Sequence, residues 1–275
     1  MSALAVAVEH VSKKYPTRRD GELLALDDCS IRIRPQEFFV LVGPSGCGKT
    51  TLLNIVAGFD TLTAGEVSLG SDVIAAPGVT LAPGPDRMVV FQHGGLFPWM
   101  TVLENVCYGP IVQKQMTRAE ASKEARTMLA RVGLRDIEKS YPGEISSGMR
   151  RRVEIIRALI GRPRILLMDE PFRALDAINK SVVQEFLLQL FDSHPHTIFF
   201  ITHDLREALF LGDRVGVMTT RPGRLKCIVD VGLPRPRSTE ILDTPEFLRL
   251  KADVTEAVHE EALKAFVAGE REVAR

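Results

Sequence analysis

Residues 43–50 read Gly-Pro-Ser-Gly-Cys-Gly-Lys-Thr and match the phosphate-binding pattern GxxxxGK(S/T). The apolar run 38–42 precedes this loop, as a buried parallel strand would, and residues 51–57 after it have the composition of a helix that Gly58 ends. In this order, backbone N–H groups and the helix dipole converge on phosphate oxygens. The flanking segments disfavour the alternative, a chance match in a glycine-rich turn. The pattern therefore predicts an α/β protein that binds a nucleoside triphosphate.

The loop also suggests roles for single side chains. Lys49 is expected to reach the β- and γ-phosphates as a point charge, and the hydroxyl of Thr50 is expected to ligate Mg²⁺. These roles leave a kinase, a GTPase, a motor protein and a transporter ATPase open. The residues expected to contact the nucleotide here are Gly43, Pro44, Ser45, Gly46, Cys47, Gly48, Lys49, Thr50 and Thr51.

The composition narrows the possible classes of protein further. Lys plus Arg and Asp plus Glu both number 35, so the net charge is zero, which argues against a nucleic-acid partner. No apolar stretch approaches the roughly 18 residues of a membrane span, and residues 1–9 lack the pattern of a secretory signal. The scattered cysteines predict reduced, mostly buried thiols in a cytosolic protein, and Cys47 is a hypothetical alkylation site.

The rest of the chain alternates between strand and helix patterns. Residues 4–42 favour strands, and Thr101 and Thr117 each begin a capping box, in which a Glu follows three positions later. Strand patterns return at 165–168 and 198–201. The predicted division is an α/β core of residues 1–94 and 161–235, interrupted by a helical insertion of about residues 95–160.

Two helices have predictable buried faces. The helix that Thr117 opens is expected to run to about Val132, with Gly133 as its stop. Residues 233–238 have the composition of a linker, and a last helix begins at Pro245 within a C-terminal extension, 236–275. We expect this last helix to pack on its own domain rather than on a partner. The predicted buried faces are Ala121, Ala125, Met128 and Val132 in the first helix, and Phe247, Leu250, Val254, Val258 and Phe266 in the last.

A second motif follows the strand pattern 165–168 and ends in two carboxylates, Asp169 and Glu170. Beside a phosphate loop, Asp169 is expected to hold Mg²⁺ through its water shell, and Glu170 to polarise the water that attacks the γ-phosphate. His203 follows another buried strand and is a candidate contact to the γ-phosphate or to that water. A lone histidine at such a place is more often structural.

In this order, the motifs resemble those of ATP-binding cassette (ABC) ATPases, the nucleotide-binding subunits of transporters, over about residues 4–235. The resemblance implies a P-loop NTPase (RecA-like) core, an N-terminal antiparallel β subdomain and an inserted α-helical subdomain. It also implies Mg²⁺-dependent ATP hydrolysis. Residues 145–150 resemble the family signature, and residues 173–176 its D-loop.

The resemblance carries roles onto single residues. Tyr15 is expected to stack on adenine, Gln92 to sense Mg²⁺ and the attacking water, and His203 to be the switch histidine. The implied catalytic residues are Lys49, Gln92, Glu170 and His203. The implied Mg²⁺ ligands are Thr50, Gln92 and Asp169. Nucleotide contacts outside the phosphate loop are Tyr15, Ser146, Ser147, Gly148 and Asp176.

In the family, two subunits dimerise head to tail, and the signature loop of one closes the ATP site of the other. Ser146 and Ser147 can also cap a helix at 149–160, and the two roles are compatible. Two residues depart from the family pattern. Ser147 replaces a glycine, so that its Cβ restricts φ or crowds the phosphate, and Arg173 replaces a small residue of the D-loop. We therefore predict reduced, not absent, ATPase activity of the isolated subunit.

Several segments, among them 148–150, 169–172, 220–224 and above all 95–99, resemble the importer subfamily for nitrate, sulfonates and taurine. This resemblance implies a homodimer or heterodimer of ATPase subunits, bound peripherally to transmembrane permease subunits at the cytoplasmic face of the inner membrane. An extracytoplasmic solute-binding protein is an indirect partner. Phe97, Trp99 and Met100 are then expected to be exposed anchors for the permease, with core packing of Trp99 as the alternative. Two other functions stay open, an ATP-dependent regulatory dimer and a weakly active cassette paired with a more active partner.

Overall fold

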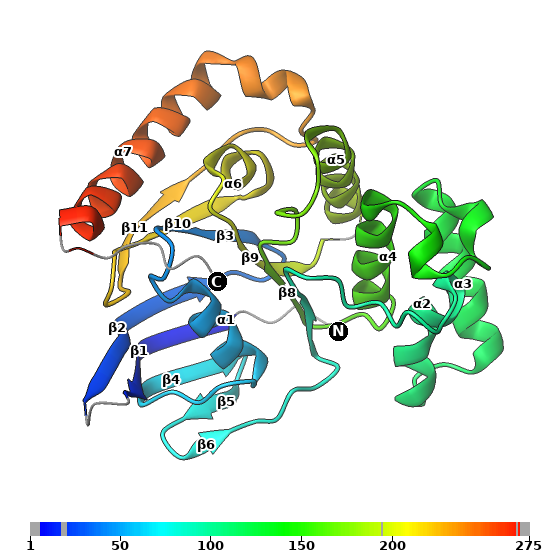
Figure 1. Ribbon diagram of the computed structural model, residues 1–275, viewed down its shortest axis with the longest axis horizontal. Coiled ribbons are helices and arrows are strands. Elements are labelled where there is room, and N and C mark those ends of the chain that lie inside the picture. The colour runs from blue at the N-terminus through cyan, green and yellow to red at the C-terminus, as the bar shows by residue number, and fades with distance from the viewer. Residues whose placement is uncertain (1–5, 18–20, 194, 268, 270–275) are drawn as a thin grey trace. The chain divides into compact units, whose positions relative to one another are not determined.

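The computed structural model describes residues 6–17, 21–193, 195–267 and 269. The chain divides into two compact units, which are Met1–Pro83 with Pro195–Arg275 (unit 1) and Gly84–His194 (unit 2). Predictions for residues 1–5 and 270–275 fall outside the described residues. The boundaries expected for the helical insertion stay a prediction. Figure 1 labels the helices and strands of both units.

An antiparallel sheet forms the N-terminal part of unit 1. Ile31 and Ile33 of this sheet are buried and Arg32 between them is exposed, in the alternation of a half-buried strand. The sheet confirms the expected antiparallel β subdomain. Its strands are, in spatial order, β2 (Glu22–Ile33), β1 (Val6–Pro16), β4 (Ala64–Leu69), β5 (Asp72–Ala76) and β6 (Val79–Thr80).

Unit 1 also contains the strand that precedes the predicted phosphate loop. This strand, β3 (Phe38–Val42), is buried along its whole length, as the continuous apolar run predicted. It pairs in parallel with β10 (Arg214–Met218) on one side and with β9 (Thr197–Ile201) on the other. β11 (Leu225–Asp230) pairs with β10 in the antiparallel sense. This order places β3 in the interior of the parallel strands.

The C-terminal helix packs on its own unit, as expected. α7 (Pro245–Val267) contacts α6 (Leu205–Leu211) and β10, and the short 3-10 helix η3 (Thr239–Asp243) precedes it (Figure 1). The remaining helix of the described part of unit 1, α1 (Lys49–Ala57), follows the phosphate loop.

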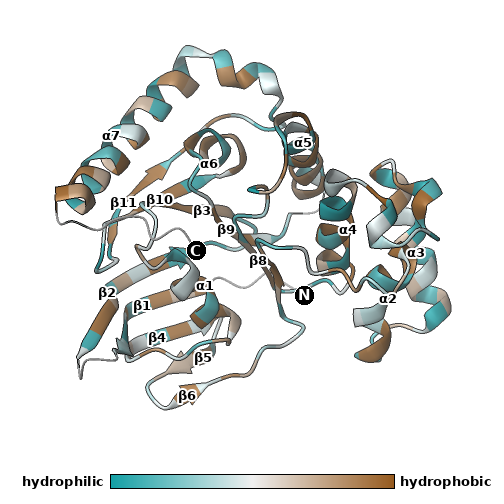
Figure 2. Ribbon diagram, viewed as in Figure 1, coloured by the Kyte–Doolittle hydropathy of each residue, from teal (hydrophilic) through white to brown (hydrophobic). Residues whose placement is uncertain are grey.

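The buried face of α7 agrees only in part with its prediction. Phe247 and Val254 are buried, whereas Phe266 is 82% exposed, so the prediction for Phe266 was wrong. At 100° per residue, Phe266 is turned by about 120° from Val254, whereas Glu261 is turned by only about 20°. Glu261 therefore continues the buried face, although the predicted face did not include this residue. Figure 2 shows the alternation of hydrophilic and hydrophobic residues along α7.

The predicted linker, residues 233–238, has irregular backbone but is firmly attached to unit 1. Arg237 is 7% exposed, and its Nη1 donates to the carbonyl oxygens of Phe210 (3.0 Å) and Gly212 (2.8 Å) at the end of α6. Arg235 forms an ion pair with Asp213. Because a cation satisfies the last carbonyls of a helix, this segment acts as a cap rather than as a free linker.

Unit 2 combines one parallel strand pair with helices. Both predicted capping boxes are present, since Thr101 and Thr117 exchange hydrogen bonds with Glu104 and Glu120. In the helix after Thr117, Leu129 is fully buried and Met128 only half-buried, so the predicted face was wrong at Met128. The elements of unit 2 are β7 (Arg87–Val90), α2 (Val102–Val112), α3 (Arg118–Arg131), η1 (Arg135–Ile137), η2 (Pro142–Glu144), α4 (Ser147–Leu159), β8 (Ile165–Asp169) and α5 (Ala177–Ser193).

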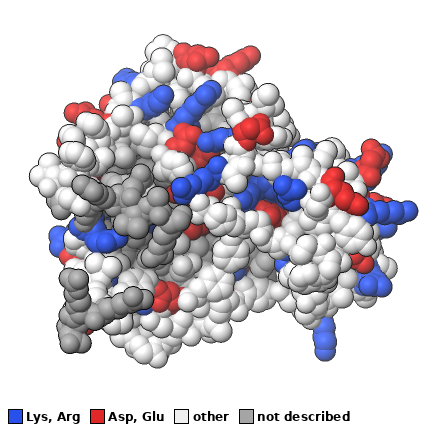
Figure 3. Space-filling model, in the orientation of Figure 1, with Lys and Arg blue, Asp and Glu red and all other residues white. Residues whose placement is uncertain are grey.

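Two surface properties bear on function. Among the described residues, no helix is long and apolar enough to cross a membrane. Basic and acidic side chains are interspersed over the face that Figure 3 shows, in keeping with the net charge of zero.

Candidate functional site

The predicted phosphate loop connects β3 to α1 within unit 1. Gly48, just before α1, has a φ of 98°, a conformation that favours glycine, and an added Cβ would lie 2.7 Å from the Leu26 side chain. Gly48 offers no side chain to cap the first N–H groups of α1, which leaves room for an anion at this helix terminus. The local geometry therefore fits a phosphate.

Lys49 lies inside the loop and is 7% exposed. Its Nζ donates to the carbonyl oxygens of Gly43 (2.8 Å) and Pro44 (2.9 Å) and lies 3.6 Å from Cys47 Sγ. These partners carry no formal charge and do not neutralise the ammonium. A positively charged ammonium beside helix N–H groups is a donor set that suits a triphosphate.

The cysteines agree with the expectation of reduced and mostly buried thiols. Cys29, Cys47 and Cys107 are buried and Cys227 is half-buried, and all four are free. Burial raises the pKa of the Cys47 thiol, against the opposing effect of the Lys49 ammonium. The Cys47 thiol is therefore buried and protonated at neutral pH, which disfavours the hypothesis that it is an alkylation site.

Tyr15 on β1 is held next to α1. Its hydroxyl donates to Asp60 Oδ2 (2.5 Å) and also hydrogen-bonds Thr51. Burial and the bond to Asp60 raise the pKa of Tyr15. The Lys13 ammonium, which pairs with Asp60 at 2.6 Å, lies 4.7 Å from the centroid of the Tyr15 ring. One ring face is thus covered by a cation, and stacking of adenine on the opposite face stays a prediction.

His203 follows β9 and is exposed. Since Leu41 lies opposite Ile201 in parallel register, the loop after β3 and the segment after β9 leave the same edge of the strands. Asp204, the next residue, caps α6 by accepting from the backbone N–H of Arg206 (2.9 Å). Unit 1 therefore brings His203 and the phosphate loop to one edge, as the prediction requires.

Unit 2 brings Gln92 and Asp169 to one edge in the same way. β7 and β8 are parallel, with Val90 opposite Met168, so Gln92 and Asp169 both lie at the carboxyl ends of their strands. Arg151 of α4 donates to the backbone carbonyl of Gln92 (2.9 Å) and to that of Phe91 (2.8 Å). The helix that begins at the signature therefore holds the Gln92 segment, a contact that the sequence did not predict.

Glu170 forms an ion pair that was not predicted from the sequence. Arg173 Nη1 lies 3.2 Å from Glu170 Oε2, where the Arg173 side chain is 60% exposed and the Glu170 side chain 15%. Glu170 has a φ of 41°, an uncommon conformation for a residue with a Cβ. The spacing of three residues was the available signal, since an arginine within a turn of a carboxylate can reach it. Arg173 thus engages the predicted base itself.

The signature segment begins α4. Ser146 is the N-cap, and its hydroxyl accepts from the Met149 N–H (3.2 Å), which confirms the capping role. Ser147 is the first residue of the helix and has no positive φ, so the expected restriction of its φ was wrong. A Cβ is tolerated there because the backbone is helical. The proposed crowding of a phosphate by Ser147 stays a prediction.

Asp176 organises the first turn of α5. Its carboxylate accepts from the backbone N–H groups of Ile178 (3.1 Å) and Asn179 (3.0 Å) and from Asn179 Nδ2 (2.6 Å), and the bonds from Asn179 hold its pKa below the usual value. An added Cβ on Gly148 would lie 2.5 Å from Asn179 Oδ1. The D-loop and the signature therefore meet through Asn179, whereas the nucleotide contacts of Asp176 and Gly148 stay predictions.

An aromatic cluster of Phe97, Trp99 and Tyr108 lies on the surface of unit 2. The rings of Phe97 and Trp99 stack with centroids 5.4 Å apart, and Tyr108 meets Phe97 edge-on at 5.1 Å. Arg157 covers Phe97 at 4.3 Å. Trp99 is 69% exposed, so core packing of Trp99 was wrong. Phe97 and Met100 are half-buried, so of the three predicted anchors only Trp99 is mostly exposed.

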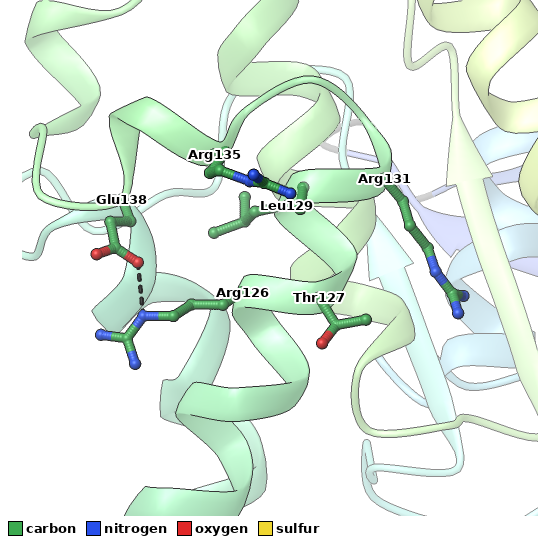
Figure 4. A pocket seen from close by; sticks show the side chains of 7 residues that line it. Arg126, Thr127, Leu129, Arg131, Arg135 and Glu138 are labelled. Carbon is green, nitrogen blue, oxygen red and sulfur yellow. Dashed lines mark hydrogen bonds and ion pairs between the residues drawn. The ribbon is translucent and has the colours of Figure 1, made fainter.

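A surface pocket of about 640 Å³ lies elsewhere in unit 2 and contains none of the predicted site residues. The Arg126 side chain beside it pairs with Glu138 at 2.7 Å, and Arg131 points away from that pair (Figure 4). Its basic groups do not converge on one point, so this pocket offers no alternative anion site.

Comparison with known proteins agrees with this geometry. The family model for "ABC transporter" matches residues 26–173. The bicarbonate transport ATP-binding protein CmpD of Synechocystis sp. is 45% identical over 90% of this chain and 86% of its own. Two solved structures of the bacterial ABC transporter cassette MJ0796 also match. Its dimeric structure has a TM-score of 0.70 at 29% identity and covers 83% of this chain and 100% of its own. Its dimeric post-hydrolysis state, bound to ADP and Pi, has a TM-score of 0.68 at 28% identity, with the same coverage.

The strand, loop and helix of unit 1 define a nucleotide-binding α/β protein of the P-loop class. The chain belongs to the ABC transporter family. It is an ATP-binding ABC-type ATPase, as the motifs predicted.

The ion pair of Glu170 gives the predicted low activity a physical cause. If Glu170 must turn toward a water, its bond to Arg173 must first break, so Arg173→Gly is expected to raise ATP turnover by up to about fivefold. Phosphate release by the purified chain measures this effect. Arg173→Lys, which keeps the charge, is the matched control and should stay near the wild-type rate. An unchanged or lower rate in Arg173→Gly would exclude the ion pair with Arg173 as the cause of low ATP turnover.

Proposed function

We propose that this chain is the ATP-hydrolysing subunit of an importer for a small solute of the nitrate, sulfonate and taurine type. The observation that carries the transport role is the exposed aromatic cluster, in which Trp99 is 69% exposed and rests on Phe97. An apolar surface of this kind suits a partner protein. The similarity to a bicarbonate transport ATP-binding protein, which is named for another small oxyanion, supports the solute class.

ATP would be held by the phosphate loop, with Lys49 on the β- and γ-phosphates and Tyr15 on adenine. Mg²⁺ would supply charge neutralisation at the phosphates when bound. Its proposed ligands are Thr50, Gln92 and Asp169, and hydroxyl, amide and carboxylate oxygens are the donors that this ion prefers. Glu170 would accept a proton from the attacking water, and His203 would orient the water or the γ-phosphate.

A second copy of the cassette would complete each site. Its Ser146, Ser147 and Gly148 would face the γ-phosphate, where the N-terminus of α4 favours negative charge. The dimeric structures of the related cassette MJ0796 support this pairing. The assembly would lie at the cytoplasmic face of the membrane, bound to permease subunits and, through them, to a solute-binding protein.

A second candidate is a weakly active cassette that pairs with a more active one. The ion pair between Arg173 and Glu170 favours it, because it occupies the proposed base. Turnover of the chain alone, compared with turnover after addition of a second cassette from the same operon, separates the two candidates.

The aromatic cluster provides the test of the transport role. Trp99→Ala is expected to weaken capture of permease subunits from detergent-solubilised membranes by about tenfold or more, because a buried tryptophan is a typical interface hot spot. ATP turnover of the free subunit should not change. Val79→Ala on β6, which also removes a half-exposed apolar side chain, is the control. Equal capture by Trp99→Ala and the wild type would remove the cluster from the interface.

A further inference from the structure

We infer that α7 positions the phosphate loop through the turn that joins β10 to β11, residues 219–224, and that Glu261 is the positioning residue. This inference rests on the proposed nucleotide site and adds to it a contribution from the C-terminal helix. All the contacts involved lie within unit 1, where α7 packs against α6 and β10 (Figure 1).

Glu261 is a buried carboxylate on the face that α7 turns to its own unit. Its side chain is 2% exposed, and it pairs with Lys264 at 2.6 Å and with Lys226 of β11 at 3.1 Å. Burial by itself raises the pKa of Glu261, but the hydrogen bonds from Lys264, the Thr220 N–H and Lys226 outweigh it and lower the pKa overall. A buried charge without such partners would destabilise the fold. Glu261 therefore serves as an anchor, a buried residue that binds specific partners, rather than as a residue that only packs on an apolar face.

Glu261 binds the turn of residues 219–224 directly. Glu261 Oε2 accepts from the backbone N–H of Thr220 at 3.1 Å. Within the turn, the N–H of Thr219 donates to the Arg224 carbonyl (2.9 Å), and the Thr219 hydroxyl accepts from the Arg224 N–H (2.9 Å). The two ends of the turn are thus tied to each other, and a displacement of Thr220 is transmitted to the whole turn.

The other side of the turn touches the phosphate loop. Arg221 Nη2 donates to the Gly46 carbonyl at 3.3 Å. Gly223 packs so closely that an added Cβ would lie 1.9 Å from the Cys47 carbonyl oxygen, and its N–H donates to the Ala25 carbonyl at 2.9 Å. The backbone of residues 46–47 therefore rests on the turn, opposite the anchor on α7.

These contacts form a continuous path from Glu261 through Thr220 and Arg221 to Gly46. When Glu261 is replaced, the turn and the phosphate loop become more mobile. Nucleotide binding must then order the loop, and this loss of conformational entropy lowers the affinity for the nucleotide. The path predicts a change in nucleotide affinity and loop dynamics, with little change in the chemical step, because it does not involve Glu170.

The test uses the full-length chain and measures MgATP affinity by calorimetry and amide hydrogen exchange without nucleotide. Glu261→Ala is expected to weaken MgATP binding roughly three- to tenfold and to speed exchange at residues 46–48. Glu261→Gln, whose amide oxygen still accepts from Thr220, should recover part of the affinity. Glu256→Ala, an exposed glutamate of α7, is the matched control. Arg221→Ala should weaken binding similarly, and adding it to Glu261→Ala should cause little further loss.

Three results would overturn the inference. One is wild-type affinity and wild-type loop exchange in a folded Glu261→Ala chain. Another is full additivity of Glu261→Ala and Arg221→Ala, which would show two independent effects. The third is uniform faster exchange throughout unit 1, the mark of a purely structural role. Failure of the proposed nucleotide site itself would look different, because the wild-type chain would then bind no MgATP.

Discussion

Replacing Glu170 with glutamine is expected to lower ATP turnover by about 10²- to 10⁴-fold, the usual contribution of a positioned general base. Glutamine keeps the shape of the side chain and can still meet Arg173, but it cannot accept a proton from water. Binding of MgATP should remain close to wild type, because Glu170 is proposed to act on the water and not to hold the phosphates. The measurements are phosphate release and equilibrium binding on the same preparation.

Glu66→Gln on β4, an exposed position, is the control for the loss of one carboxylate. A Glu170→Gln chain that kept more than about half of the wild-type rate would exclude Glu170 as the base, because removal of a general base costs far more. The ATP-bound form should also accumulate in this variant, since binding continues while hydrolysis is blocked.

Replacing Lys49 with alanine is expected to act on binding. Its ammonium donates to the Gly43 and Pro44 carbonyls. The change therefore removes two hydrogen bonds that hold the loop and the positive charge that is proposed to bind the phosphates. Loss of a charged hydrogen bond of this kind should weaken MgATP binding by about 10- to 100-fold. Turnover should fall at least as far, because the same charge is proposed to stabilise the transferring phosphoryl group.

Calorimetric titration with MgATP measures the loss of affinity. Lys123→Ala, at an exposed position of α3, is the matched control and should bind as the wild type does. Binding by Lys49→Ala with unchanged affinity would place the nucleotide elsewhere. Lys49→Ala and Glu170→Gln therefore test two different steps, since the first reports on nucleotide binding and the second on ATP hydrolysis.

The features that follow from local pattern could be predicted from the sequence. The continuous apolar run correctly predicted that β3 is buried along its whole length. Threonine followed by glutamate three positions later correctly predicted both capping boxes. The order of the motifs was sufficient for the family. These features depend on residues close together in the chain, where periodicity and hydrogen-bonding chemistry leave little choice.

The features that depend on tertiary contact were missed. Arg173 was expected only to replace a small residue of the D-loop, and its ion pair with Glu170, three positions earlier, was not predicted although the spacing allows it. Glu261 was overlooked because its partners Lys226 and Thr220 are more than 30 residues away, whereas Phe266 was placed in the core on hydrophobicity alone. The expectation that a Cβ at Ser147 restricts φ was wrong, because the backbone at this position is helical.

We propose that ATP is hydrolysed in a site shared by two copies of the cassette. Mixing two defective variants tests it most directly. Lys49→Ala damages the phosphate loop, and Ser146→Arg places a bulky side chain at the exposed cap of α4, so each variant alone is expected to be nearly inactive. In a mixed dimer, the intact phosphate loop of one chain meets the intact signature of the other.

Phosphate release by the equimolar mixture is the measurement, with native mass spectrometry to count mixed dimers. Random pairing in a two-fold dimer makes half of the dimers mixed, with one good site each, so about a quarter of the wild-type rate is expected to return. A mixture that forms mixed dimers and stays as inactive as its components would contradict a shared site. A Ser146→Arg chain that hydrolyses ATP at the wild-type rate would contradict it as well.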